Sequence, residues 1–194
     1  MELDFAALQR LIDTEAIREV ALRYTRGVDR HDEALLRSAY HLDATDDHGA
    51  FIGSVEGFIE YANRVHTQNW VCHQHFVTNQ TIDFDGDSAH CESYFLAVLK
   101  RDDGVCDLVG GRYVDRIERR EGAWAVAARV CMVEWNLEAG PGNAPMDASV
   151  FVAGTWDKSD PSYMRPLQVA RPPSETADRR SPAIIAPRGA SGGA

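Results

Sequence analysis

The chain has 194 residues, of which 44% are hydrophobic, and its formal net charge is −10. This length and apolar content suffice for one folded domain with a real core, and they exclude a chain of the disordered class. Thirty acidic residues outweigh twenty basic ones, and no basic cluster interrupts that balance. Nucleic acid and anionic membranes are therefore excluded as expected partners.

The expected location is the cytoplasm, without membrane contact. No stretch approaches the ~20 apolar residues that a membrane-spanning helix needs, and the opening MELDFAALQRLIDTE lacks the pattern of a secretory signal. The cysteines are widely spaced and contain no C-x-x-C pair, which predicts free thiols rather than a disulfide framework or a structural zinc site. They are Cys72, Cys91, Cys106 and Cys131.

Hydrophobic residues recur at helical spacing in the first third of the chain. Residues 13–30 predict the clearest helix, with Asp13 or Thr14 as its N-cap. Residues 32–40 and 54–66 predict two further helices, the latter capped by Ser54. Between them, the polar, glycine-punctuated segment HLDATDDHGAFIG favours a strand and a turn.

After residue 74 the hydrophobic period changes to two. Four extended runs are separated by the turn signals FDGD, KRDDG and RREG, which is typical of an antiparallel meander. Helices followed by a meander predict an α+β fold, in which the N-terminal helices pack on one face of a curved, mainly antiparallel sheet.

The chain divides into three parts by composition. Residues 1–138 are expected to form the folded domain, and residues 139–170 an irregular extension that packs on this domain or on a neighbouring subunit. The extension carries the aromatic residues Phe151, Trp156 and Tyr163. Residues 171–194 are rich in Pro, Ser, Gly and Ala, which predicts a disordered tail.

Two polar residues sit awkwardly on the first long helix. Tyr24 lies on its apolar stripe, and Asp29 closes the helix where the dipole disfavours an anion. A compensating partner for Asp29 is therefore expected. Surface neutralisation by Arg26 or Arg30 is equally compatible with the local sequence.

His73 and His75 project from the same face if a strand has already begun there. An H-x-H pair is a familiar metal-ligand pattern, but no third ligand follows at a recognisable spacing. His90, Asp46 and His48 are candidates for a third ligand only if the fold brings one of them near the pair. We therefore predict no metal site and expect His73 to point elsewhere.

The final strand, AVAARVCMVEW, is apolar on both faces, which predicts that it is covered on two sides. Arg129 and Cys131 share one of these faces. A cation in an enclosed space needs an anionic substrate, a core acid or an escape to water. A structural Arg129 paired with a core acid is an equal alternative to a substrate-binding one.

The chain resembles the SnoaL-like branch of the nuclear transport factor 2 superfamily over roughly residues 8–138. The likeness rests on the helix ending in GVD (27–29), the HFVTN run (75–79), the hairpin LVGGRYVDRIERREGAW (108–124), and the order of helices before meander. Members of this branch include scytalone dehydratase, bile acid 7α-dehydratase and γ-hexachlorocyclohexane dehydrochlorinase. The resemblance implies a cone-shaped α+β barrel closed around an apolar pocket.

The resemblance also implies roles for individual residues. Asp29 and His75 match the Asp and His pair of these lyases, and Tyr24 matches a tyrosine of the bile acid dehydratase site. Arg129 and Tyr113 match pocket positions of the dehydrochlorinase, and His48 falls near a tyrosine position of scytalone dehydratase. The remaining predicted substrate-binding residues are Phe95 and Cys131.

The sequence also departs from its relatives. The second pocket histidine of scytalone dehydratase has only His90 as a counterpart, and the strand register favours Cys91, Ser93 and Phe95 facing inward instead. The lysine that serves the dehydrochlorinase near Tyr24 is absent. An oxygenated substrate is therefore expected rather than a halogenated one.

These residues predict a cofactor-independent lyase that carries out a dehydratase-like β-elimination on an apolar cyclic or steroid-like small molecule. Neutral His75 is the expected general base, and Asp29 orients it. Two alternatives stay open: a ketosteroid-type isomerase or polyketide cyclase, which needs the same base, and a non-catalytic binding or assembly module.

A homo-oligomer is also expected, with a trimer preferred, because the outer face of the sheet needs cover. The residues predicted on this face are Val126, Ala128, Val130 and Met132 of the final strand and Leu96 and Val98 of an earlier one.

Overall fold

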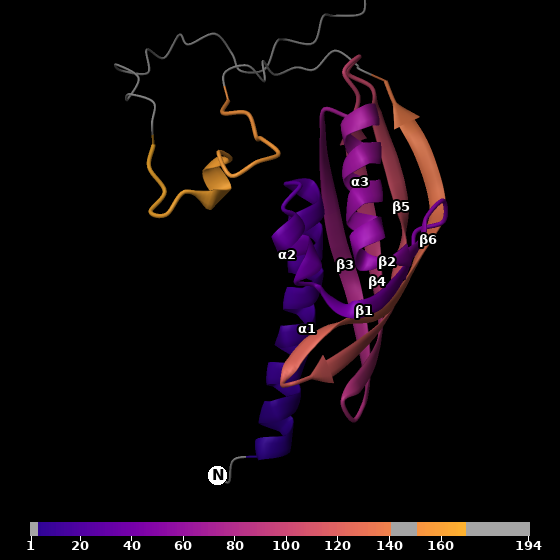
Figure 1. The fold of residues 1–194 in the computed structure, drawn as a ribbon, viewed down its shortest axis with the longest axis vertical. Helices are drawn as coiled ribbons and strands as arrows, with labels where there is room; N and C mark the ends of the chain where they lie inside the picture. Colours follow the sequence, from indigo (N-terminus) through magenta and orange to yellow (C-terminus); the bar gives the residue numbers. More distant parts are fainter. Residues whose placement is uncertain (1–3, 141–150, 170–194) are drawn as a thin grey trace, which may run out of the picture. The chain divides into compact units, whose positions relative to one another are not determined.

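The structure, a computed structural model, describes residues 4–140 and 151–169. The chain forms two units, Met1–Gly140 and Pro141–Ala194, each considered separately. The first unit holds three helices and six strands (Figure 1). They run α1 (Phe5–Asp29), α2 (Glu33–Arg37), β1 (Tyr40–Asp47), β2 (Ile52–Ser54), α3 (Val55–Asn69), β3 (Cys72–Asp85), β4 (Ser88–Lys100), β5 (Cys106–Arg120) and β6 (Ala123–Ala139).

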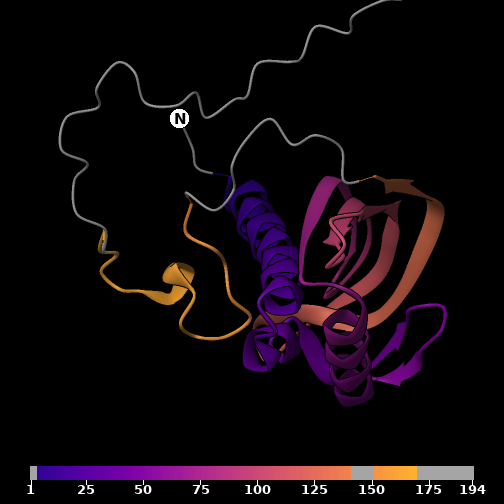
Figure 2. The ribbon, with the colours of Figure 1, turned by 90° about the horizontal axis from the view of Figure 1, so that it is seen from above.

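The six strands form one sheet in the order β2-β1-β6-β5-β4-β3. Only the β1–β6 pair is parallel, and every other neighbour is antiparallel. The sheet curls toward α1 and α3, as the view from above shows (Figure 2). The predicted α+β fold, with helices on one face of a curved and mainly antiparallel sheet, is confirmed.

The first helix begins eight residues before the predicted N-cap at Asp13. Its N-cap is Asp4, whose carboxylate accepts hydrogen bonds from the amides of Ala6 and Ala7. Asp13 lies inside the helix, and its carboxylate accepts a 2.9 Å hydrogen bond from the indole of Trp124. The carboxylate that the local sequence predicted as an N-cap therefore binds Trp124 of β6 instead.

The other predicted elements differ mainly in length. The second helix is a single short turn, capped by Asp32, because the chain enters β1 at Tyr40. The third helix has the predicted cap, Ser54, and continues to Asn69. The predicted strand and turn before it are the hairpin of β1 and β2.

A bulge in β6 changes the predicted alternation of its faces. Ile117 pairs with Val126 and Arg116 with Ala128, so one residue of β6 is skipped. A shift of one residue exchanges the two faces of a strand. Val126 is consequently buried in the core, contrary to the prediction, whereas Val130 and Met132 beyond the bulge are 45% and 39% exposed on the outer face.

A second bulge bends the sheet where β5 carries the pair Gly110–Gly111. A Cβ on Gly111 would lie 1.9 Å from the carbonyl oxygen of Met132, so no other residue fits there without backbone movement. A Cβ on Gly110 would overlap the ring of Trp135. The two glycines therefore let β6 cross β5 closely at the bend.

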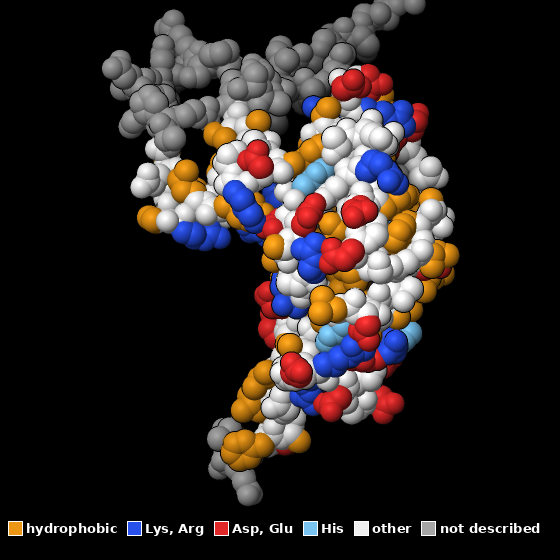
Figure 3. All heavy atoms as spheres, in the orientation of Figure 1, with side chains coloured by type: hydrophobic (Ala, Val, Ile, Leu, Met, Phe, Trp, Pro, Cys, Tyr) orange, Lys and Arg blue, Asp and Glu red, His pale blue; other side chains and the backbone are white. Residues whose placement is uncertain are grey.

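In the second unit, the described residues 151–169 contain a 3-10 turn, Pro161–Tyr163, capped by Asp160. Residues 141–150 and 170–194 lie outside the described residues, and the second range includes the whole of the predicted disordered tail, 171–194. Among the described residues, no helix is both long and apolar enough to cross a membrane. On the face drawn in Figure 3, basic and acidic side chains are interspersed rather than gathered into a basic patch.

Candidate active site

Asp29, the last residue of α1, holds two histidines of β3. Its Oδ1 lies 2.7 Å from Nδ1 of His75 and 3.0 Å from Nδ1 of His73. Its Oδ2 accepts a 2.9 Å hydrogen bond from the backbone N–H of His75. The predicted contact between Asp29 and His75 is present, and it joins two segments 46 residues apart.

These hydrogen bonds compensate the anion at the helix end. The Asp29 side chain is only 14% exposed, and burial raises its pKa, but the hydrogen bonds from His73 and His75 outweigh burial and lower the pKa to about 2. The turn that follows is tight because Gly27 lies against the backbone of Leu36, where a Cβ would come within 2.6 Å. The three hydrogen bonds keep Asp29 ionised and hold its carboxylate in one orientation.

The carboxylate also sets the tautomers of both imidazoles. A carboxylate only accepts hydrogen bonds, so each Nδ1 that faces it carries the proton. The Nε2 atom of a neutral imidazole is then left with a lone pair. His75 lines the adjacent cavity, where such an atom can accept a proton.

The cavity has a volume of about 180 Å³ and lies between α1, α3 and the sheet. Six of the predicted site residues line it, and Arg129 and Asp29 do not. The predicted residues along its wall are Tyr24, His48, His75, Phe95, Tyr113 and Cys131. Burial raises the pKa of the Cys131 thiol to about 12, so this residue contributes a neutral wall rather than a nucleophile.

A second Asp–His pair lies at the end of β1, with Asp46 on the strand and His48 just after it. Nδ1 of His48 is 2.5 Å from Oδ1 of Asp46, which is fully buried. The Tyr40 hydroxyl donates a 2.6 Å hydrogen bond to the other oxygen of Asp46. Nε2 of His48 lies 3.4 Å from the hydroxyl of Tyr24, and burial raises the pKa of Tyr24, which keeps its proton in place. Sequence reasoning singled out His48 but missed Asp46 as its partner.

Arg129 lies behind the cavity wall and does not line the cavity. Its guanidinium makes two 2.7 Å hydrogen bonds to Asp115 and stands 4.1 Å from the ring centre of Tyr24 and 4.4 Å from that of Tyr113. Of the two alternatives, the core ion pair is the one that the structure shows, whereas a role of Arg129 in substrate binding stays a prediction. The rings that Arg129 supports are the ones that line the cavity.

The predicted orientation of His73 is wrong. Its imidazole faces Asp29 through Nδ1, and its Nε2 lies 3.3 Å from Nε2 of His31. His66 of α3 packs against the same ring, with the centroids 4.3 Å apart. Sequence reasoning missed His31 and His66 because neither has a spacing that relates it to His73.

The strand register around the cavity is as predicted. Cys91, Ser93 and Phe95 are buried, whereas His90 is exposed and outside the site.

The curved sheet and the helices on its face form an α+β cone, and His75, held by Asp29, lines the cavity inside it. A family model described as the SnoaL-like domain matches residues 9–130. The chain therefore belongs to the SnoaL-like family, within the nuclear transport factor 2 superfamily. No sequence among curated proteins matches the chain.

Solved structures share this fold. The type 2 hexachlorocyclohexane dehydrochlorinase LinA is 25% identical, with 70% of this chain and 99% of that chain covered and a TM-score of 0.63. The type 3 LinA from Novosphingobium barchaimii LL02 is 24% identical, with 69% and 94% covered and a TM-score of 0.64. A scytalone dehydratase-like protein from Novosphingobium aromaticivorans DSM 12444 is 17% identical, with 69% and 95% covered and a TM-score of 0.60.

Proposed function

We propose that this protein is a lyase that eliminates water from a small, apolar, cyclic compound with a hydroxyl group β to a carbonyl. The observation that carries the proposal is the hydrogen bond from Nδ1 of His75 to Asp29, beside a largely apolar cavity. The structural likeness to a dehydrochlorinase and to a scytalone dehydratase-like protein supports elimination as the reaction type.

His75 is the proposed base. Its Nε2 takes the proton from the carbon beside the carbonyl, and Asp29 stabilises the imidazolium that forms. General base catalysis supplies about 10²- to 10⁴-fold, so orientation within the cavity and stabilisation of the enolate-like charge must supply the rest.

Elimination also needs a proton donor for the leaving hydroxide. The Tyr24 hydroxyl lines the cavity, and His48 stands 3.4 Å behind it. In the proposed step, the electrons of the C–H bond form the C=C bond, the C–O bond breaks, and the oxygen leaves as water with the proton of Tyr24. The proton that His75 has gained then returns to Tyr24 through solvent as the product leaves, which restores both groups, and Asp46 holds His48 beside the Tyr24 hydroxyl.

The cavity favours a substrate with one ring. A dry cavity of about 150 Å³ holds a benzene ring, so the present 180 Å³ suits one substituted ring better than a steroid skeleton. We therefore favour a small, single-ring compound among the predicted apolar and cyclic substrates.

A panel of cyclic β-hydroxy ketones, followed by mass spectrometry, tests the proposal. We expect loss of water with the wild-type protein, and a loss of ~10²-fold or more in kcat for His75→Gln. His90→Gln is the matched control, because His90 is exposed and away from the cavity. A product of unchanged mass would support the isomerase instead, and binding without turnover would support the binding module.

A further inference from the structure

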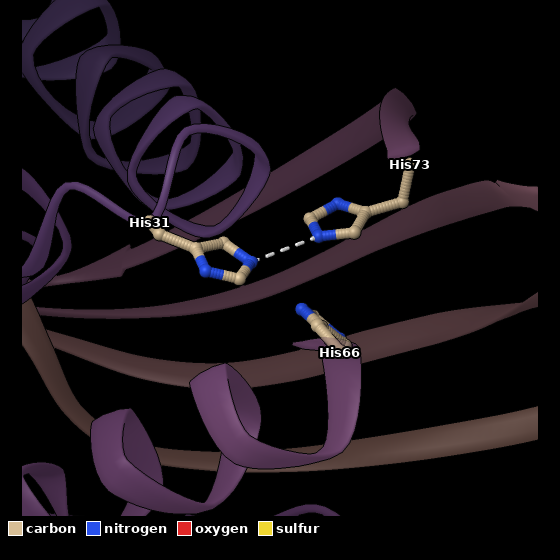
Figure 4. Close-up of side chains that lie close together, drawn as sticks. All are labelled: His31, His66 and His73. Carbon is tan, nitrogen blue, oxygen red and sulfur yellow. Dashed lines mark hydrogen bonds between the residues drawn. The ribbon is translucent and has the colours of Figure 1, made fainter. Parts of the chain in front are cut away.

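A cluster of three histidines lies beside the Asp29–His75 pair, and the proposed elimination does not use it. His31 comes from the turn after α1, His66 from the last turn of α3 and His73 from the start of β3. One ring nitrogen of each lies within 4.8 Å of the other two. Figure 4 shows the three imidazoles facing a common point between the elements.

His73 is oriented as a metal ligand usually is. Ligating histidines commonly donate their second ring N–H to a carboxylate, which fixes the tautomer and the direction of the lone pair. Here Nδ1 of His73 faces Asp29 at 3.0 Å, and Nε2 points into the cluster. Because Asp29 also orients His75, one carboxylate directs one imidazole toward the cavity and the other toward the cluster.

The separation between His31 and His73 fits two ligands of one ion. Two nitrogens bound tetrahedrally to zinc at ~2.0 to 2.1 Å lie about 3.3 Å apart. The Nε2 atoms of His31 and His73 are 3.3 Å apart. Because the ligand atoms are at most 4.8 Å apart, a shift of His66 by no more than roughly 1.5 Å completes the set.

His66 supports a metal site independently of these distances. Its Nδ1 is buried and has no hydrogen-bond partner among the described residues. A buried polar atom of this kind is uncommon, and an ion is one of its ordinary explanations. Burial also lowers the pKa of His66 to about 2 and that of His31 to about 4, so both rings present lone pairs at neutral pH.

We propose that His31, His66 and His73 bind one divalent transition-metal ion of the zinc type. Three imidazoles and no thiolate suit Zn²⁺ and its first-row neighbours rather than Ca²⁺ or Mg²⁺. A tetrahedral ion with three protein ligands keeps one position for water or a substrate oxygen. His66 also lines the cavity, so the ion lies beside the substrate space.

The test is zinc binding without substrate, which makes its outcome independent of the proposed elimination. Untagged, chelator-treated protein is titrated with Zn²⁺ by calorimetry, and with Co²⁺ while the visible absorption of a tetrahedral site is recorded. We expect one ion per chain, and at least ~10-fold weaker binding in His31→Gln and in His66→Gln. Circular dichroism confirms that each variant is folded, and His90→Gln is expected to bind as the wild type does.

Two results would overturn the proposal. The first is no binding of Zn²⁺ or Co²⁺ at micromolar concentration by the folded wild-type protein. The second is binding that is kept in His31→Gln and His66→Gln but lost in His75→Gln. That pattern would assign the ion to the other candidate group, Asp29, His73 and His75.

Discussion

Replacing Asp115 by Asn tests how much the buried ion pair behind the cavity wall contributes to stability. The side chains of Arg129 and Asp115 are 2% and 4% exposed, and two 2.7 Å hydrogen bonds join them. Burial alone lowers the pKa of Arg129, but Asp115 raises it well above its ordinary value, so the guanidinium stays charged. Asp115→Asn leaves that charge without its counter-ion in the core.

The expected cost follows from this geometry. Removing one partner of a buried pair costs about 3–5 kcal/mol, because the remaining charge stays desolvated. For a protein of this length, that loss lowers the melting temperature by roughly 10 °C. We expect a loss of this size because the two hydrogen bonds are bidentate and both side chains are almost completely buried.

Thermal unfolding followed by circular dichroism measures the effect. The control is Glu56→Gln, which breaks the exposed ion pair with Arg37 and is expected to leave the melting temperature unchanged. The double variant Asp115→Leu with Arg129→Met removes both charges and is expected to recover most of the loss. If Asp115→Asn melts with the wild type, the burial argument is refuted.

Three further changes probe the bend, the first helix and the outer face. Gly111→Ala is expected to lower the melting temperature because its Cβ meets the β6 backbone at 1.9 Å, whereas Gly140→Ala, in open space, leaves it unchanged. The hydrogen bond from Trp124 lowers the pKa of Asp13 below its ordinary 3.8, so its stabilisation is present above that value and is lost as pH falls through the folded value. Asp13→Asn should therefore flatten the decline of stability between about pH 5 and 3, and an unchanged acid limb would contradict this. Light scattering is expected to give about three times the 21.5 kDa chain mass, and Met132→Glu a mass nearer one chain. A wild-type protein of one chain mass would show that the outer face is not an interface.

The pair at the site was predicted from the family resemblance, together with one local anomaly in the first helix. Asp29 is an anion at the end of a helix where the dipole disfavours it, and His75 lies near the start of β3 in the HFVTN run on which the resemblance rests. The contact between them satisfies the anion, so the physical reason was visible before the geometry. His48 was named from the resemblance alone, because it falls near a tyrosine position of scytalone dehydratase.

The histidine cluster could not be predicted from spacing. His31, His66 and His73 meet because α3 and β3 dock beside the end of α1, and side-chain direction at such a junction depends on the whole fold. The register of β6 could not be predicted from the sequence for another reason. Ala125, Ala127 and Ala128 around the bulge are small on both sides, so the hydrophobic pattern carries no sign of the residue at which the faces exchange.

The curvature of the sheet and the proposed proton-transfer groups come from different elements of the fold. The proposed proton-transfer groups, Tyr24 and His75, come from α1 and β3, whereas the backbone crossing that curves the sheet belongs to β5 and β6. Cavity shape therefore depends on strands that carry none of these groups. In a lineage with this arrangement, the range of accepted compounds can drift through changes in β5, β6 and α3 while the reaction type is inherited unchanged.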